Sequence, residues 1–507
     1  MSWTTRVLVI LAMCIAFTSG CVGPSPAPPT RPVAEKLQAP REGPEFPGLM
    51  AALGPKGELY LAFHAIDRDA KLLQALFARS TDLGATWDKS PVQLFSTTDQ
   101  DVSVNLPVIR TDEKGGIYLA WRWKHQGIKH IFFARSLDGG RTWPGQPTQL
   151  AIPGQPFAPL MDVDPTGHLS LLWQDEEQGK KGFWFVGSID SGATWQAEPV
   201  RLTASSPSTA RLYTPGLTSD GRGHVYAVWH EVDHSPPHFT HSIKLNRSAD
   251  FGATWLPSAE TVYSTPQHSP PWPVHPSLFA DSDGHVYLLW QEYDSTGIYD
   301  LYFTRSDDAG VTWHPKVRLN MTPPREAMAR HHQLAFDGRG NLYAVWVAEQ
   351  DQDTMIAFRR STDFGETWGP ELRLDERKRG VNSLSPVIAT DVQGHVVTVW
   401  QQLDLKGWGV YTNRSDDFGV TWLPRPLRLD TLPERASHPR LIQLLSDKEG
   451  QPYVVWRGDT FGKEDFFMTR STDHGKSWPP KEQWLTDSSA LHLRQAAVQD
   501  GGPPSHP

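Results

Sequence analysis

The 507-residue chain is predicted to be all-β and to fold as a β-propeller of four-stranded blades. Three observations predict this fold class. A motif of the form S-x-D-x-G-x-[ST]-W occurs eight times, at a spacing of 52 to 60 residues. Each repeat holds four short apolar runs separated by turn residues, and the composition is rich in proline, glycine and tryptophan. A spacing this regular indicates one repeated architecture.

The motif itself is explained best as a structural turn. Its aspartate can accept hydrogen bonds from nearby backbone amides, its glycine can supply a positive φ, and its tryptophan can pack between sheets. We therefore expect a structural role for all eight aspartates. They are Asp82, Asp138, Asp190, Asp250, Asp308, Asp363, Asp417 and Asp473.

The order of the apolar runs is clearest in the fifth repeat. One run starts at His275, a second ends at Trp290, a third covers residues 298–305, and a fourth starts at Val317 after the motif. Strands this short cannot bury both faces alone, so neighbouring units must stack. Radial stacking gives a propeller and avoids long exposed edges. We expect eight blades, with a seven-bladed ring plus an irregular unit as the alternative.

Two segments could supply the last strand of the ring. Residues 33–37 precede the repeats, whereas residues 482–485 belong to the eighth repeat itself.

Seven further tryptophans end the second run of their repeats, and Phe63 takes that place in the first repeat. We expect these rings to be buried in the core rather than to bind sugars. The seven are Trp121, Trp173, Trp229, Trp290, Trp346, Trp400 and Trp456.

The N-terminus has the pattern of a secretory signal, with an apolar run over residues 7–17 that is too short for a permanent bilayer span. The small residues before Cys21 resemble the lipobox of bacterial lipoproteins, which implies lipidation of Cys21. A plain secreted protein is the alternative. We expect an exported protein, anchored in the outer membrane or at the cell surface.

The chain is accordingly divided into four parts. Residues 1–20 are the signal peptide, and residues 21–46 form a lipidated, proline-rich tether. Residues 47–488 form the propeller, and residues 489–507 a disordered tail. The lipid would be the contact of the chain with the membrane.

Charge and composition exclude one class of partner. A formal net charge of −9 with no basic block argues against nucleic acid. The D-x-x-G turns, such as those at Asp164 and Asp337, resemble fragments of calcium loops, but they are explained more simply as hairpin turns between first and second strands. We expect no cofactor and no metal ion.

Eight motifs of this form resemble the Asp boxes, or BNR repeats, of the sialidase superfamily, over roughly residues 47–488. The resemblance implies a propeller with each Asp box between the third and fourth strands of a blade. Catalytic members also share an arginine two residues before a proline on the first inner strand, two further arginines that grip a carboxylate, an acidic Asp, and a tyrosine nucleophile paired with a glutamate. The matching positions here carry other residues, which argues against sialidase catalysis. They are Glu45, Asn105, Phe157, Tyr213, Val274, His331, Leu384 and Ser437.

Ligand-binding residues are expected at the end of the ring opposite the motifs, where first strands begin and second strands end. Candidates for ligand binding are Arg211, Arg330, Arg435, His275, His332 and His438. Candidates for a tyrosine and carboxylate pair are Tyr213, Glu231, Glu292 and Asp175. The alternative is that these charges pair with each other on a solvated rim. The three histidines occupy equivalent positions, but their blades are too far apart to share a metal ion.

Two functions fit these residues. The first is a non-catalytic binding or scaffold lipoprotein of the cell envelope, which presents the mouth of its propeller to a glycan or an envelope protein. The second is an exo-glycosidase of the sialidase type, which would release sialic acid or a related acidic sugar and would need two acidic groups, or a tyrosine with its base, at the mouth.

Overall fold

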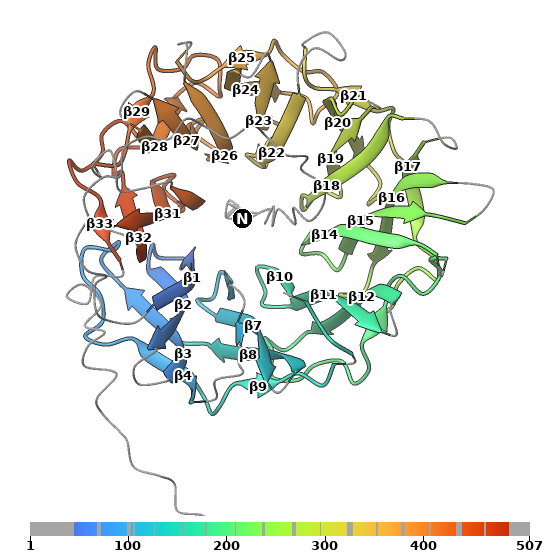
Figure 1. Ribbon diagram of the computed structural model, residues 1–507, viewed down its shortest axis with the longest axis vertical. Coiled ribbons are helices and arrows are strands. Elements are labelled where there is room, and N and C mark those ends of the chain that lie inside the picture. Colours follow the sequence, from blue (N-terminus) through green and yellow to red (C-terminus); the bar gives the residue numbers. More distant parts are fainter. Residues whose placement is uncertain are drawn as a thin grey trace, which may run out of the picture.

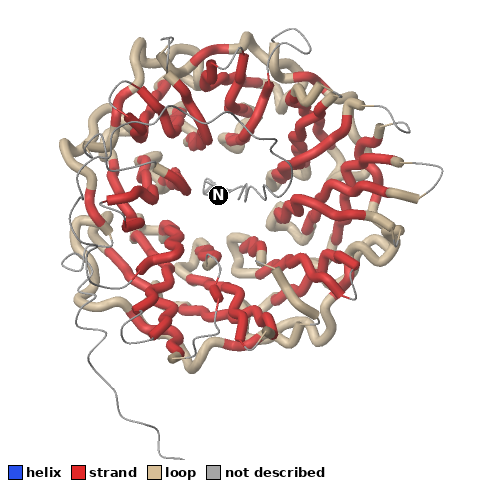
Figure 2. The backbone as a smooth tube through the Cα atoms, in the orientation of Figure 1, coloured by secondary structure: helices blue, strands red, loops and turns tan. Residues whose placement is uncertain are grey.

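The computed structural model confirms the all-β propeller and its eight blades, which form a closed ring (Figure 1). Its elements are strands joined by turns and loops (Figure 2). No helix among the described residues could cross a bilayer. The described residues are 45–67, 72–98, 103–104, 107–125, 127–152, 154–157, 159–177, 180–207, 209–235, 239–265, 270–294, 296–321, 328–350, 353–376, 381–404, 407–431, 439–460 and 463–485. The predicted signal peptide, Cys21 and the tail lie outside them.

Each blade is one antiparallel sheet whose strands follow each other in chain order. Blade 1 consists of β1 (Glu45–Leu53), β2 (Leu59–Asp67), β3 (Leu72–Ser80) and β4 (Val92–Thr97). Blade 2 consists of β5 (Ser103–Val104), β6 (Val108–Thr111), β7 (Ile117–His125), β8 (Ile128–Ser136) and β9 (Thr148–Gln149), with both β5 and β6 paired to β7. Blade 3 consists of β10 (Leu160–Val163), β11 (Leu169–Glu177), β12 (Lys180–Ser188) and β13 (Val200–Arg201). Blade 4 consists of β14 (Arg211–Ser219), β15 (Val225–Asp233), β16 (Thr240–Ser248) and β17 (Glu260–Ser264).

The second half of the ring repeats this order. Blade 5 consists of β18 (Trp272–Ala280), β19 (Val286–Tyr293), β20 (Tyr299–Ser306) and β21 (Val317–Arg318). Blade 6 consists of β22 (Met328–Phe336), β23 (Leu342–Gln350), β24 (Asp353–Ser361) and β25 (Leu372–Arg373). Blade 7 consists of β26 (Asn382–Thr390), β27 (Val396–Asp404), β28 (Gly407–Ser415) and β29 (Leu427–Arg428). Blade 8 consists of β30 (Arg440–Ser446), β31 (Pro452–Thr460), β32 (Lys463–Arg470) and β33 (Gln483–Trp484).

Blades 8 and 1 close the ring through side chains. The eighth repeat supplies its own outer strand, β33, which pairs with β32, while residues 33–37 lie outside the described part of the chain. Gln443 of blade 8 accepts a hydrogen bond from the Ala51 amide at 2.8 Å and donates one to the Leu49 carbonyl at 3.2 Å, both in blade 1. These two bonds satisfy backbone groups on the inner edge of β1 that would otherwise be buried without partners.

The core of the protein lies between the blades. The seven tryptophans that were expected to end the second strands lie inside these strands, which continue beyond them. They and Phe63 are each at most 1% exposed, which confirms that they are core residues. Trp346 of blade 6 packs with Phe279, Leu289 and Leu301 of blade 5. Each blade therefore buries apolar surface against its neighbour, and no blade has a sufficient core of its own.

The eight repeated motifs form identical turns after the third strands. In the fifth, Asp308 Oδ1 accepts hydrogen bonds from the Ser306 hydroxyl at 2.7 Å and the Thr312 amide at 2.8 Å, and Oδ2 accepts one from the Thr312 hydroxyl at 2.6 Å. The hydroxyl and amide of Thr194 likewise lower the pKa of Asp190 to about 2. The motif glycine is required by space as well as by φ: a Cβ on Gly252 (φ +82°) would lie 2.3 Å from the Phe185 ring of blade 3.

Candidate functional site at the rim of blades 4 to 6

Besides β1, whose pairing with β2 shifts between Glu45 and Gly48, five inner strands carry the same irregularity, toward the end of the ring opposite the motifs. In β14, β18, β22, β26 and β30, the pairing with the second strand is interrupted by a bulge. At each bulge one residue other than glycine is left-handed, with φ between 45° and 52°. These residues are Thr214, His275, His331, Ser385 and Leu441. Bulges and left-handed residues are common beside ligand sites, which makes this end of the ring the place where a ligand is expected.

The bulges correct the predicted alignment of the blades. The residues directly before them are Tyr213, Val274, Arg330, Leu384 and Arg440. Alignment on proline predicted His331 and Ser437 at this position in blades 6 and 8, and both assignments are wrong. The reason is that blade 6 has His332, and blade 8 has Ile442, where the other three blades have proline. Two blades therefore carry an arginine at the position where the sialidase resemblance implies one.

The corrected alignment also changes which histidines are equivalent between blades. His275 corresponds in blade 6 to His331, and not to His332. The His275 ring lies 3.1 Å from Gln291 Oε1, the His331 ring lies 3.2 Å from the Ser385 hydroxyl, and the His332 ring lies 3.1 Å from the Ser277 hydroxyl. Burial and the nearby charges of His275 and His331 lower the pKa of His332 to about 3. These three rings thus form one neutral group at neutral pH. His438 lies outside the described residues.

A continuous row of rings crosses the rim from blade 4 to blade 5. Tyr213 stacks on His230 with the ring centroids 5.4 Å apart, His230 on His241 at 5.1 Å, and His241 on Trp272 at 5.4 Å. Tyr293 follows at 5.0 Å from Trp272, and then Tyr299 at 5.4 Å from Tyr293. We call Tyr213, Trp272, Tyr293 and Tyr299 the aromatic rim, because all four reach the surface.

The two histidines in this row are buried and form its support. His230 Nε2 lies 3.0 Å from His241 Nδ1, so one ring donates a hydrogen bond to the other. Burial, followed by the nearby His241 and His275, lowers the pKa of His230 to about 3. Burial and the nearby His234 lower the pKa of His241 to about 4. The pair is therefore neutral at physiological pH and holds Tyr213 and Trp272 on either side of it.

Arg330 ends the row with a positive charge. Its guanidinium carbon lies 6.0 Å from the centre of the Tyr299 ring, at the limit of a cation–π contact. One of its terminal nitrogens lies 3.4 Å from Glu349 Oε2. The side chain is 42% exposed, so solvent reaches the ion pair and a ligand carboxylate could replace Glu349 there.

The predicted carboxylates lie in places other than the open rim. Glu231 is 5% exposed and accepts hydrogen bonds from the Trp229 indole and the Ser206 hydroxyl. Glu292 is 2% exposed and accepts them from the Trp290 indole and from Lys316. Burial raises the pKa of Glu292 despite these donors. Asp175 is also buried, and accepts a hydrogen bond from the Gln155 amide.

The catalytic candidates are therefore not gathered around one substrate position. Glu231, Glu292 and Asp175 belong to the second strands of three different blades. Second-strand side chains face neighbouring blades, which explains why residues that follow the core tryptophans by two positions are buried with them. Tyr213 is paired with His230 rather than with a carboxylate. Arg211 is exposed at the start of β14, and Arg435 lies outside the described residues.

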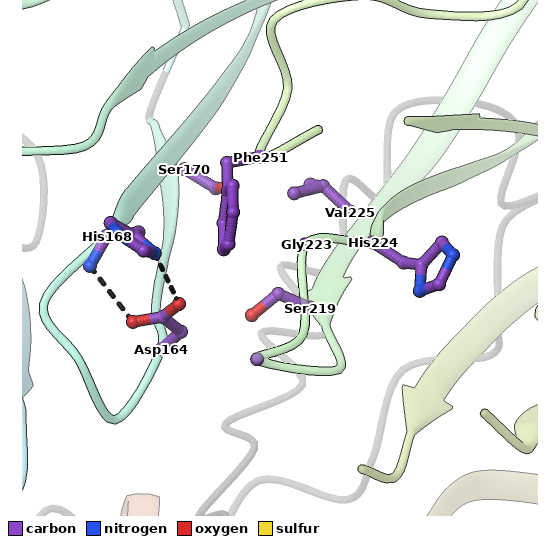
Figure 3. A pocket seen from close by; sticks show the side chains of 9 residues that line it. Asp164, His168, Ser170, Ser219, Gly223, His224, Val225 and Phe251 are labelled. Carbon is purple, nitrogen blue, oxygen red and sulfur yellow. Dashed lines mark hydrogen bonds and ion pairs between the residues drawn. The ribbon is translucent and has the colours of Figure 1, made fainter. Parts of the chain in front are cut away.

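Several residues of the row were not predicted from the sequence. Trp272, Tyr299 and His241 stand at the beginnings of strands, and their contacts cross blade boundaries. A signal was present, because several aromatic residues stand close to strand ends in repeats four and five. Two hollows lie at the motif end: one of about 190 Å³ beside Trp143, and one of about 10 Å³ beside Phe251 (Figure 3).

Comparison with known proteins gives no family. No family model and no curated protein sequence matches the chain. Similar solved structures include an ulvan lyase, a polysaccharide lyase bound to a GlcA–Rha3S saccharide, which is 12% identical, with 71% of this chain and 90% of that chain covered and a TM-score of 0.45. An α-L-arabinanase of Penicillium chrysogenum is 15% identical over 62% and 93% of the two chains, with a TM-score of 0.40. A Hadza microbial sialidase is 19% identical over 70% and 63%, with a TM-score of 0.34.

Proposed function

We propose that the protein is an exported, lipid-anchored propeller that binds an acidic glycan at the aromatic rim without cleaving it. The observation that carries this proposal is the row of surface-reaching rings from Tyr213 to Tyr299, which ends at Arg330. Aromatic rings offer flat apolar faces on which the C–H faces of a sugar can pack. A few polar groups beside such rings then fix the orientation of the ligand.

The charge at the rim favours an acidic sugar over a neutral one. Arg330 presents a partly exposed guanidinium, and the neighbouring His275 and His331 residues are exposed. A guanidinium can bind a carboxylate through two hydrogen bonds, and the imidazoles can donate or accept further ones. The rim is therefore suited to a uronic acid or a sialic acid residue of a larger glycan.

The alternative function is an exo-glycosidase of the sialidase type. Arg330 and Arg440, which occupy equivalent positions in blades 6 and 8, favour it because that mechanism uses several arginines to hold one carboxylate. The buried positions of Glu231, Glu292 and Asp175 favour binding without catalysis. We therefore keep non-catalytic glycan binding as the proposed function.

The binding test uses a panel of sialosides and uronic-acid polymers with the purified protein. Trp272→Ala is expected to weaken binding of the best ligand at least about 10-fold, because a central aromatic contact is lost. Isothermal titration calorimetry measures the change. Trp313→Ala is the matched control, since it removes a half-buried tryptophan from the motif end of the same blade and should leave the affinity unchanged.

Two outcomes would contradict the proposal. Binding to none of the panel would remove the acidic glycan as ligand. Release of the terminal sugar from a fluorogenic sialoside, lost in Arg330→Ala, would favour the glycosidase instead. Circular dichroism of each variant checks that the fold is intact.

The lipid anchor rests on the sequence around Cys21 and has its own test. Expressed with its signal peptide, the Cys21→Ser variant is expected to move from the detergent phase to the aqueous phase in a phase-partition experiment, and to lose labelling by radioactive palmitate. Cys14→Ser is the matched control, because Cys14 lies within the apolar run that would be removed. Equal partition of the parent and Cys21→Ser would contradict lipidation.

A further inference from the structure

Four of the turns between first and second strands contain the same pair of side chains. In each, a histidine Nδ1 donates to the carboxylate of an aspartate four residues earlier, at 2.5 to 2.8 Å. The pairs are Asp164–His168, Asp220–His224, Asp281–His285 and Asp391–His395. These turns lie at the motif end of the ring, far along each strand from the rim. The Asp–His pair alone is explained by the structure of the turn. The blades differ in the residue that packs against the histidine.

The motif of the following blade supplies the residue that covers the histidine. The covering residue is the left-handed one between the aspartate and the glycine of the motif. Phe251 of blade 4 covers His168 of blade 3 (Figure 3), and the two ring centroids are 4.2 Å apart. Phe364 of blade 6 covers His285 of blade 5 at 4.6 Å. Both junctions are thus an Asp–His pair under an apolar ring.

The junction between blades 7 and 8 has a histidine where the other two have phenylalanine. His474 covers His395 with the ring centroids 3.9 Å apart and the ring planes 13° from parallel. Its Nδ1 lies 3.9 Å from Asp391 Oδ2. That nitrogen is buried and has no hydrogen-bond partner. A buried polar atom without a partner is costly in a protein, so its presence here calls for an explanation.

We propose that Asp391, His395 and His474 bind a divalent transition-metal ion, in the first instance Zn²⁺. Among the described residues they form a group whose three ligand atoms all lie within 4.8 Å of one another. Two imidazoles and one carboxylate are a donor set that suits zinc. Tetrahedral zinc places its ligand atoms about 3.4 Å apart, so small side-chain rotations would complete the site.

The neighbouring backbone holds these ligands in place. Asp391 Oδ1 accepts hydrogen bonds from the Gln393 amide at 2.9 Å and the His395 amide at 3.0 Å, and Oδ2 accepts the one from His395 Nδ1. An ion would take the place of the proton in that last hydrogen bond, and Nε2 of the same ring would carry the proton instead. The His474 amide donates to Gln451 Oε1 at 2.9 Å. Outer contacts of this kind orient metal ligands. His395 and His474 are 18% and 25% exposed, so an ion can enter, and water can occupy a fourth position.

Such an ion would join two blades next to the junction that closes the ring. Asp391 and His395 belong to blade 7 and His474 to blade 8, so each bound ion would add a link between two sheets that also share apolar packing and the Lys476–Asp416 ion pair. An ion that binds only the folded ring stabilises it in proportion to the logarithm of its concentration over Kd. Zinc is therefore expected to raise the melting temperature of the parent protein.

The test is a titration of the untagged, EDTA-treated full chain with Zn²⁺, followed by calorimetry and by thermal melting. The parent is expected to bind one ion at this site and to melt at a higher temperature with zinc. His474→Phe is expected to bind at least about 10-fold more weakly and to lose the thermal shift, because one ligand is gone. This variant should fold, since the junctions at Phe251 and Phe364 already have phenylalanine in that place.

A second test is to create a zinc site at a junction that has phenylalanine in the place of His474. Phe364→His gives the junction of blades 5 and 6 the same three side-chain types, so it is expected to bind one ion more than the parent. Co²⁺ in place of Zn²⁺ reports the donor set through its visible absorption. Equal zinc affinity and equal thermal shift in the parent and His474→Phe would overturn the proposal, and so would a parent that binds no zinc.

Discussion

Acidification from pH 7 to pH 4 is expected to destabilise the protein strongly, because several histidines are buried in neutral form. His64, His230 and His332 are at most 5% exposed, and burial is the main cause that lowers the pKa of each to about 3. The unfolded chain binds a proton at each near pH 6.5, whereas the folded chain does not. The stability that these neutral histidines contribute is therefore fully present above pH 6.5, and it is lost as the pH falls toward 3. Between these two pH values, each histidine lowers the free energy of unfolding by up to about 1.4 kcal/mol for every pH unit of acidification.

The contribution of one histidine can be measured from the slope of the free energy of unfolding against pH, by comparing the parent with a variant that lacks that histidine. Urea unfolding of His332→Gln, measured between pH 6.5 and 4, is expected to show a slope lower than that of the parent by up to about 1.4 kcal/mol per pH unit. Buried carboxylates with raised pKa values, such as Glu292 and Asp375, act in the opposite direction, but they are common to both proteins. His314→Gln is the control, because the His314 ring is 48% exposed. An unchanged slope in His332→Gln would show that this histidine is protonated in the folded state.

Truncation of one core tryptophan is the second large effect. Trp346→Ala is expected to lower the free energy of unfolding by about 3 to 5 kcal/mol, because it opens a cavity between blades 5 and 6. The Trp346 indole nitrogen has no hydrogen-bond partner, so the loss is one of packing alone. Calorimetric unfolding at neutral pH measures the difference between the variant and the parent.

Two further variants test this interpretation. Trp346→Phe keeps a ring and most of the volume, and is expected to cost clearly less than Trp346→Ala. Trp368→Ala removes the half-buried motif tryptophan of the same blade and is also expected to cost less. Equal losses in Trp346→Ala and Trp368→Ala would mean that the second-strand tryptophans have no special place in the core.

The repeat made the architecture predictable. Eight copies of one motif, with four apolar runs in each, were enough to predict the blades, their number and the burial of residues such as Trp346 and Phe63. The reason is that these features depend on local sequence that recurs at a fixed spacing. The closing contact of Gln443 with Ala51 could not be predicted, because it joins residues 392 positions apart and occurs once.

The site was less predictable for two physical reasons. A bulge moves the register by one residue, so Arg330, and not His331, aligns with Tyr213. In addition, the second strands continue past Trp229 and Trp290, where they were expected to end, so Glu231 and Glu292 lie inside strands and are buried against the neighbouring blades. The proposed metal ligands were not predicted together, because Asp391 and His395 belong to a hairpin turn and His474 to a motif, and they meet only where blades 7 and 8 adjoin.

The way in which the ring is closed affects how such a protein can change in evolution. Each described sheet is one uninterrupted stretch of chain, and blades 8 and 1 meet through side chains such as Gln443. The position of the chain ends is therefore independent of the circular order of the sheets. A gene that began at another repeat would encode the same set of sheets, and duplication or deletion of a whole repeat would leave no strand without its sheet.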